Sequence, residues 1–290
     1  MRSVETLLFW LKVSRPGLWF QTVWLYTVPI GAGIDWNTAE FWFGLVYVTW
    51  PLNLLVYGWN DIVDIDIDQE NPRKDSWLFG ARGTRAQLKS LPPLIVLAQV
   101  PFLIGFILLK GWIMLGLVVG IVGVNATYNA KIAGLRGRPP FDLINPLGYL
   151  LVLELAIQLT DAPHPPIATY LYLALFCVHA QLIGEVMDFY PDRASGRVTS
   201  CTKLGVISTK WLIIAMVFIE GLLIVFVFED IPLGGMLLFG TSWLVYDVLF
   251  FSKSRPYTTT EFKLAGVGMN AAGFLSMAWV WMTGSISALP

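Results

Sequence analysis

Residues 60–68 read Asn-Asp-Ile-Val-Asp-Ile-Asp-Ile-Asp and close an apolar segment that is long enough to cross a bilayer. On a helix, Asp61, Asp64 and Asp68 have the spacing i, i+3, i+7 and share one face, whereas Asp66 points elsewhere. A face of this kind needs cations, because like charges held together raise one another's pKa values. The stretch therefore predicts a helix that delivers an acidic face to one end of a membrane span.

A second acidic pair, Asp188 and Asp192, ends another long apolar run. Polar residues precede both clusters at helical spacing and predict two stripes that line a cavity instead of facing lipid. Two acidic faces in equivalent places suggest one metal site divided between them. The polar residues are Asn53, Tyr57 and Asn60 before the first cluster, and Gln181 and Glu185 before the second.

The composition indicates an integral membrane protein. The 290 residues are 56% hydrophobic and only 13% charged, and the mean hydropathy is +0.65, which is too apolar for a soluble domain of this length. Cys177 and Cys201 have no metal-site spacing and predict no disulfide framework. Residues 1–16 include Glu5 and Lys12, lack a small-residue cleavage site and are expected to form an amphipathic interfacial segment.

Apolar stretches of about 17–25 residues, the length that crosses a bilayer, predict an all-α, multi-pass protein with nine transmembrane helices around a central cavity. Residues 1–290 are expected to form a single integral-membrane domain in which 61–90 and 188–210 are cytoplasmic loops that carry the Asp motifs. The predicted spans are 17–34, 41–60, 91–109, 111–127, 142–159, 166–187, 211–228, 232–250 and 263–283.

The distribution of basic residues predicts the orientation of these spans. Of the 19 Lys and Arg residues, all except Lys110 fall in the N-terminal segment or in the loops after the even-numbered spans. Because positive residues favour the cytoplasmic face, the N-terminus and both Asp-motif loops are expected on that face or its equivalent, and the C-terminus on the opposite one. The second and sixth spans then run in the same direction, so the two acidic clusters can meet.

The charge balance predicts a substrate that carries phosphate. The two clusters offer only oxygen ligands, which favours Mg²⁺ over zinc. Mg²⁺ is usually held by a few carboxylates together with phosphate oxygens of the substrate, and basic loop residues can neutralise the remaining charge. A diphosphate with an apolar remainder fits, with its head at the acidic mouth and its tail between helices. The basic loop residues are Arg73, Lys74, Arg82, Arg85, Lys131, Arg136, Arg138, Arg193, Arg197 and Lys203.

The motifs resemble those of the UbiA superfamily of intramembrane prenyltransferases, and the resemblance covers the whole chain. It extends to Ser14-Arg15-Pro16 and to Tyr128, although relatives commonly have Pro after this Tyr and Lys one position later, a pattern from which Lys131 departs. The family's first motif, N-D-x-x-D-x-x-x-D, is matched by Asn60, Asp61, Asp64 and Asp68, and the second, D-x-x-x-D, by Asp188 and Asp192.

The resemblance implies Mg²⁺-dependent transfer of a prenyl group from a prenyl diphosphate to a lipophilic acceptor. The five motif aspartates would bind the metal and serve as the catalytic residues, in a cavity that excludes water. Membrane lipids are the expected surroundings, and no nucleic-acid partner is expected. The expected substrate-binding residues are Asn60, Asn53, Arg15, Tyr128, Lys131, Arg138, Arg82 and Arg193; Phe20, Trp24, Tyr57, Trp59 and Tyr149 could offer aromatic faces to a cation.

Two other classes of membrane protein also use intramembrane carboxylates. A cation-coupled transporter would normally place them near the midplane on broken helices, whereas here they close the spans beside basic loops. A phosphatidyl-type transferase could use Mg²⁺ and a D-x-x-x-D pair, but the D-G-x-x-A-R segment of such enzymes is missing. These features favour the prenyltransferase.

The acceptor is predicted from local similarity and from charge. Residues 64–74, Ser14-Arg15-Pro16 and the sequence before Asn60 look most like the lycopene elongase branch, whose acceptor is a carotenoid. The first, second, fifth and sixth spans offer few cations to hold an acceptor carboxylate, Arg15 being the main exception, which favours a neutral acceptor. The alternative is an aromatic acceptor of quinone or chlorophyll-type biosynthesis.

The remaining titratable residues of the spans receive structural interpretations. Glu154, Glu220 and Asp247 are costly inside spans, although Glu154 could line the cavity, and inter-helix hydrogen bonds or an interface explain them more simply. His164 and His179 are isolated in the sequence and are assigned no role. Asp142 is expected to cap a helix.

Overall fold

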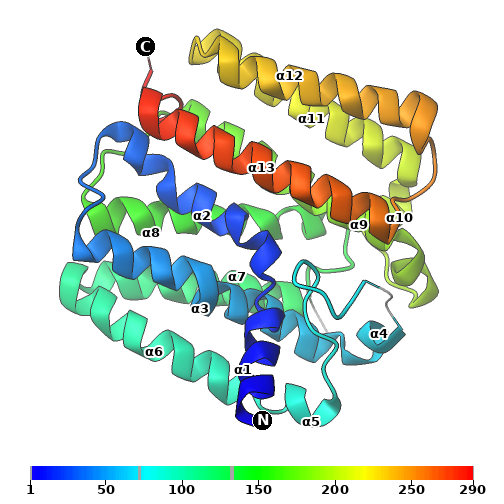
Figure 1. Cartoon of the computed structure of the whole chain (residues 1–290), viewed down its shortest axis with the longest axis horizontal. Coiled ribbons are helices and arrows are strands. Elements are labelled where there is room, and N and C mark those ends of the chain that lie inside the picture. Colours follow the sequence, from blue (N-terminus) through cyan, green and yellow to red (C-terminus); the bar gives the residue numbers. More distant parts are fainter. Residues whose placement is uncertain (1, 71–72, 131–133, 290) are drawn as a thin grey trace.

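The protein is a bundle of helices that run mostly alongside one another (Figure 1), and the computed structural model describes residues 2–70, 73–130 and 134–289. These residues form helices and no strand, as predicted. The longer elements are α3 (Ala39–Val63), α6 (Leu91–Lys110), α7 (Trp112–Asn129), α9 (Ile167–Ala194), α11 (Val206–Val227), α12 (Ile231–Tyr246) and α13 (Thr259–Thr283). The shorter ones are α1 (Arg2–Val13), α2 (Trp19–Thr27), α4 (Ile65–Glu70), α5 (Arg85–Leu88), α8 (Leu150–Thr160), α10 (Ser200–Leu204) and η1 to η5 (Pro16–Leu18, Val28–Ala32, Phe141–Leu143, Asn145–Tyr149 and Asp247–Phe251).

Eight helical segments of the described chain are long and apolar enough to cross a membrane, and they correspond to the second to ninth predicted spans. The protein is therefore an integral membrane protein. The segments are Ala39–Val63, Arg85–Lys110, Trp112–Asn129, Phe141–Thr160, Ile167–Ala194, Val206–Val227, Ile231–Phe251 and Thr259–Thr283.

The first predicted span, 17–34, is a mixed helix instead of a continuous α-helix. Only the nine residues of α2 are α-helical, and the three residues of η1 and the five of η2 continue the path as 3₁₀ turns. Pro16 and Pro29 each remove a backbone donor at these junctions, which explains the change of helix type. Because a 3₁₀ turn rises more steeply than an α-helix, the segment still spans about 30 Å, the thickness of a hydrocarbon core.

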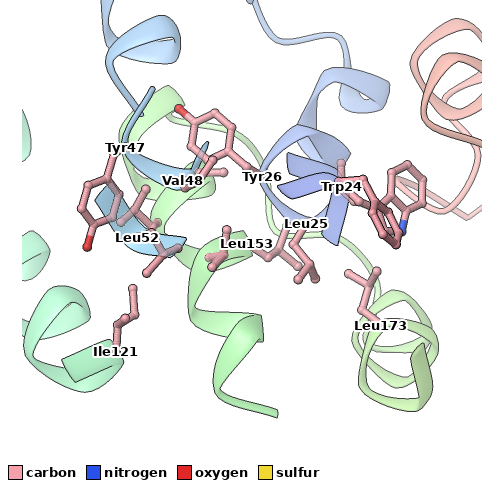
Figure 2. Packing of buried hydrophobic residues seen from close by; sticks show 14 of the residues in the cluster. Trp24, Leu25, Tyr26, Tyr47, Val48, Leu52, Ile121, Leu153 and Leu173 are labelled. Carbon is pink, nitrogen blue, oxygen red and sulfur yellow. The ribbon is translucent and has the colours of Figure 1, made fainter. Parts of the chain in front are cut away.

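Helices α2, α3 and α8 share a tightly packed core. Figure 2 shows Leu153 of α8 between Leu25 of α2 and Leu52 of α3, and all three side chains are buried. The hydroxyl of Tyr26 donates a hydrogen bond to the carbonyl of Phe41 at 2.8 Å. This contact brings α2 so close to α3 that a Cβ at Gly44 would lie 2.1 Å from the Tyr26 hydroxyl oxygen, so only glycine fits there.

Helix α1 crosses the bundle instead of running with it (Figure 1). Phe9 and Val13 are buried against the bundle, whereas Val4, Leu7 and Leu8 are exposed.

The two ends of the bundle can be told apart in Figure 1 by the elements that lie there. Helix α4 and the C-terminal end of α9 lie at one end of the bundle, and the C-terminus of the chain lies at the other.

Candidate active site at one end of the bundle

The first acidic motif straddles the end of α3. The helix stops one residue before Asp64, whose backbone leaves the helical conformation (φ −93°, ψ 11°) before α4 begins. The expectation that Asp61, Asp64 and Asp68 lie on one continuous helix face is therefore wrong, because the backbone breaks at Asp64. Lys74 brings two of them back together, since its Nζ lies 2.6 Å from Asp61 Oδ1 and 2.7 Å from Asp68 Oδ2.

Asp66 points away from the other aspartates of the motif, as the spacing predicts. Its carboxylate is exposed and lies 2.7 Å from Nη2 of Arg85, which is also exposed. Asp61 and Asp64, by contrast, are only 2% and 5% exposed. The motif therefore has a buried acidic side and a single solvated carboxylate beside it.

The second motif meets the first through Arg197. Asp188 and Asp192 lie in the last two turns of α9, and Asp192 is buried. Nη2 of Arg197 lies 2.7 Å from Asp64 Oδ1, and its Nη1 lies 3.2 Å from Asp192 Oδ1. The structure thus brings the two acidic clusters to the same place, as the parallel direction of their spans allows.

Further basic side chains from distant segments contact Asp61, Asp64 and Asp188. Arg15 Nη2 lies 2.9 Å from Asp61 Oδ1, and its guanidinium stacks over the ring of Tyr57 at 4.5 Å. Arg136 pairs with Asp64 and donates through Nη1 to Asn60 Oδ1 at 2.5 Å. The five motif aspartates thus face five basic side chains, since Arg73 pairs with Asp188 and Lys74 and Arg197 make the contacts above.

Burial and charge act in opposite directions on ionisation at this site. Burial raises the pKa of Asp68 above its usual value, and the charge of Lys74 offsets only part of that effect. Burial lowers the pKa of Arg15, but nearby acidic groups, Asp61 first, outweigh it and the net direction is upward. Burial is thus the dominant effect at Asp68, whereas the neighbouring negative charges together are the dominant effect at Arg15.

A cavity of about 430 Å³ opens from this acidic region into the bundle. Asn60, Asp188 and Asp192 line its mouth, together with four arginines, Arg15, Arg73, Arg136 and Arg197. Its walls are mainly apolar and aromatic and include Phe20, Trp24, Leu52, Tyr57, Tyr128, Tyr149, Val152 and Phe176. Four of the five aromatic residues expected to face a cation thus line the cavity, whereas Trp59 does not.

The donor chemistry of the site fits Mg²⁺. Asp61 Oδ2 is buried and has no hydrogen-bond partner in the described chain, which leaves a carboxylate oxygen available to a ligand. Among the described residues, no three Asp, Glu, His or Cys side chains lie close enough together to hold an ion by themselves. Mg²⁺ does not require such a cage, because it is commonly held by one or two carboxylates, water and phosphate oxygens.

Several residues expected to bind substrate do not line the cavity. Asn53 is fully buried and donates to Thr22 Oγ1 at 2.9 Å and to backbone carbonyls of its own helix, so it supports packing between α2 and α3. Arg82, Arg138 and Arg193 are exposed and lie outside the cavity lining. Lys131 lies outside the described residues.

The cations that hold the aspartates were only partly identified from the sequence. Arg73, Lys74, Arg136 and Arg197 belong to the basic loops, but nothing in their spacing distinguished them from Arg82, Arg138 and Arg193. Most of these residues lie in loops, which have no helical period that would tell which side chains turn inward, and Arg193 lies in the last turn of α9. Tertiary structure alone selects them.

The intramembrane acids have identifiable partners. Glu154 accepts a hydrogen bond from the Tyr170 hydroxyl at 2.5 Å and does not line the cavity. Asp247 lies 3.4 Å from Lys210 Nζ and accepts a hydrogen bond from the Ser252 hydroxyl at 2.6 Å. Both acids therefore have the inter-helix or interfacial contacts that the sequence suggested.

Asp142 and His179 differ from their expected roles. Asp142 was expected to cap a helix, but its carboxylate instead accepts hydrogen bonds from the backbone and hydroxyl of Ser200, the first residue of α10, at 2.6 and 2.7 Å, and the N-cap of that helix is Thr199. His179 is not isolated, because its Nδ1 lies 2.7 Å from Glu220 Oε1. The two residues lie on different helices, 41 positions apart, so no local sequence pattern could have paired them.

Curated relatives of similar length share a consistent description. A lycopene elongase/hydratase from Corynebacterium glutamicum is 28% identical over 202 residues, covering 67% of this chain and 69% of the relative. A lycopene elongase/hydratase from Haloarcula japonica is 28% identical over 231 residues, covering 74% of this chain and 75% of the relative.

The fold also matches a solved structure. A UbiA homolog from Archaeoglobus fulgidus bound to DMAPP and Mg²⁺ superposes with a TM-score of 0.64 at 16% identity, covering 93% of this chain and 99% of that one. The model of the UbiA prenyltransferase family matches residues 18–272 of the sequence. That match includes both aspartate motifs and most of the helices around the cavity, and the chain belongs to the UbiA prenyltransferase family.

Proposed function

We propose that residues 1–290 form a single integral-membrane domain that transfers a prenyl group from a prenyl diphosphate to a neutral lipophilic acceptor, in a reaction that requires Mg²⁺. The observation that carries this proposal is the contact of Arg197 with both Asp64 and Asp192 at the mouth of an apolar cavity. A charged head and an apolar tail would find complementary surroundings within one continuous space.

The motif aspartates Asp61, Asp64, Asp68, Asp188 and Asp192 would hold Mg²⁺, which polarises the diphosphate and stabilises its negative charge as it leaves. Arg15, Lys74 and Arg197 would then transfer their hydrogen bonds from carboxylates to diphosphate oxygens. Guanidinium groups suit this exchange because they bind carboxylate and phosphate with the same fork of donors.

The aromatic lining would serve the prenyl cation that forms when the carbon–oxygen bond to the diphosphate breaks. Tyr57 and Tyr149 lie beside the mouth, Tyr128 receives a hydrogen bond from Gln181 at 3.3 Å, and all three line the cavity. Ring faces attract cations, and a lining of this kind keeps out the water that would otherwise capture the cation.

A carotenoid such as lycopene is the acceptor that we favour. The Lys and Arg residues of the described cavity lining are the four arginines at the mouth, and each of them contacts a motif aspartate. Among the described lining residues, the deeper part of the cavity offers no Lys or Arg to an acceptor carboxylate, and the imidazole of His179 is already paired with Glu220, which favours a neutral polyene. The names of the relatives from Corynebacterium glutamicum and Haloarcula japonica support the same acceptor.

The proposed orientation places the N-terminus and loops 61–90 and 188–210 in the cytoplasm, or on the equivalent face, and the C-terminus opposite. The positive residues of the even-numbered loops support this orientation. Residues 1–16 would lie in the membrane interface, since the exposed Val4, Leu7 and Leu8 of α1 offer an apolar surface to lipid.

Co-expression in a lycopene-producing host tests the function. The unmodified chain should convert lycopene into a carotenoid whose mass has increased by a prenyl unit, and Asp61→Ala should abolish that product at equal protein abundance. Unchanged pigment, combined with prenylation of hydroxybenzoate or homogentisate by the same membranes, would assign the chain to an aromatic acceptor. Unchanged pigment without release of diphosphate would contradict the enzymatic function altogether.

A further inference from the structure

A buried acid–base pair lines the cavity away from the aspartate motifs. His179 of α9 and Glu220 of α11 are joined by a contact of 2.7 Å between Nδ1 and Oε1, and both residues line the cavity. The side chain of Glu220 is 0% exposed, and that of His179 is 12% exposed. A carboxylate at this depth in a membrane span is expensive, so its retention in a cavity wall points to function.

The second oxygen of Glu220 adds an independent observation. Oε2 is buried and has no hydrogen-bond partner in the described chain. A purely structural glutamate would be expected to satisfy both oxygens, because an unsatisfied buried oxygen costs about 1–3 kcal/mol. Glu154, the glutamate of the neighbouring α8, accepts a hydrogen bond from Tyr170 outside the cavity and provides a natural contrast.

The pair is separated from the metal-binding region along the same helix. His179 precedes Asp188 by nine residues, which corresponds to roughly 13 Å along α9. Phe176 packs edge-on against the imidazole, with ring centroids 5.5 Å apart. If the diphosphate head is held at the aspartates, His179 and Glu220 lie farther along the cavity, beside the space that the acceptor would occupy.

We infer that His179 is the base that removes a proton from the acceptor after prenyl transfer, and that Glu220 positions it. The inference rests on the proposed function. The carbon–oxygen bond of the donor breaks and its electron pair leaves with the diphosphate. A carbon–carbon double bond of the acceptor then attacks the prenyl carbon and leaves a cation on the acceptor. Loss of a proton to His179 returns the C–H electron pair to the acceptor as a new double bond.

The geometry assigns different roles to the two side chains. In the proposed arrangement the imidazole donates from Nδ1–H to Oε1 of Glu220, because an ionised carboxylate can only accept. Nε2 is then the nitrogen that accepts a proton, and the carboxylate stabilises the imidazolium that results. A polyene acceptor would lose a proton from a carbon next to the cationic centre, and an aromatic acceptor would lose the proton of the ring carbon that was attacked. Both losses need a base beside the acceptor.

The test compares His179→Gln and Glu220→Gln in the full-length protein in membranes of the lycopene-producing host, with labelled prenyl diphosphate and Mg²⁺. His179→Gln should lower the rate of proton-loss product at saturating donor by about 100-fold or more, the usual contribution of a general base. The KM for the donor should stay within about twofold. Because the acceptor cation then persists, the fraction of product that carries an added water should rise.

Glu220→Gln should shift the product ratio in the same direction with a smaller loss of rate, since the imidazole remains. Glu154→Gln is the matched control and should change neither rate nor product ratio, because it removes an intramembrane carboxylate outside the cavity. Normal rate and product ratio in His179→Gln would overturn the inference, as would a rise in donor KM with an unchanged product ratio. Absence of transfer by the unmodified chain would instead overturn the proposed function, and this inference with it.

Discussion

Nη2 of Arg197 lies 2.7 Å from Oδ1 of Asp64, although 133 positions separate the two residues in the sequence. The same guanidinium also reaches Asp192, so a single side chain from the loop after α9 joins the two acidic motifs. Without it, Asp64 and Asp192 would face each other with less compensating charge at the mouth of the cavity. The contact therefore determines how the two halves of the site come together.

Replacement of Arg197 by Gln should raise the KM for prenyl diphosphate by roughly 10- to 100-fold, because a buried charge-assisted contact contributes about 1.5–3 kcal/mol. Arg197→Lys should recover only part of the loss, since Lys cannot contact two carboxylates with a planar fork. Steady-state kinetics on membranes measure both variants. Lys203→Gln removes an exposed charge nearby and serves as the control; equal effects of Arg197→Gln and Lys203→Gln would contradict a specific role.

Asp64→Asn and Asp188→Asn should abolish prenyl transfer without lowering the amount of protein in the membrane. Both carboxylates are proposed metal ligands at the mouth of a cavity and do not support the apolar core. Asp66→Asn is the matched control from the same motif, because its carboxylate is exposed and, among the described residues, forms an ion pair with Arg85 alone, which is also exposed. Transfer rates are measured over a range of Mg²⁺ concentrations. Near-normal turnover of Asp64→Asn or Asp188→Asn at saturating donor would rule out a metal site shared by the two motifs.

The orientation can be measured by labelling cysteines. Cys177 and Cys201 are both buried, so the unmodified protein should react little with a membrane-impermeant thiol reagent. Asn37→Cys, in the loop before α3, should be labelled in intact cells, whereas Ser254→Cys, in the loop before α13, should be labelled only after lysis. The reverse pattern would invert the proposed orientation. The second to eighth predicted spans separate Asn37 from Ser254, so the two positions should lie on opposite faces. Labelling of both cysteines from the same side would contradict this odd number of intervening spans.

Gly44→Ala should destabilise the bundle without touching the aspartate site. A methyl group there would lie 2.1 Å from the Tyr26 hydroxyl oxygen and 2.5 Å from Leu159 Cδ2, and overpacking of this kind costs about 1–3 kcal/mol. The loss should appear as a lower temperature of unfolding in detergent. Tyr26→Phe removes one of the clashing atoms, so the double variant should be more stable than Gly44→Ala alone. Additive losses in the double variant would show that the clash is not the cause.

The fold was largely predictable because each membrane span is a long apolar run of consecutive residues. The run, its helical periodicity and the charges beside it can all be read from a short stretch of sequence. The 3₁₀ turns of the first span could not be read from the apolar run, since Pro16 and Pro29 change the local hydrogen bonding without interrupting it. The break of α3 at Asp64 was also missed. Helical spacing predicts which residues share a face only while the helix continues, and nothing near Asp64 marks its end.

The site was predictable as far as its motifs and no further. The aspartates were identified by their spacing, whereas their partners come from distant loops. Arg136, for example, reaches Asn60 across 76 positions. The pairing of His179 with Glu220 depends in the same way on how α9 packs against α11. Contacts of this kind follow from the packed structure, because two isolated polar residues in separate spans carry no shared local signal.

The balance between the five aspartates and their basic partners has a consequence for the order of events at the site. A metal ion that arrives alone must displace guanidinium or ammonium groups that then have no anion to contact. A diphosphate that arrives alone draws those groups away and leaves carboxylates uncompensated. When the two arrive together, each satisfies the groups that the other releases. Binding of Mg²⁺ and of diphosphate should therefore be positively coupled, with each strengthening the affinity for the other by the same factor, so that the site discriminates against either ion by itself.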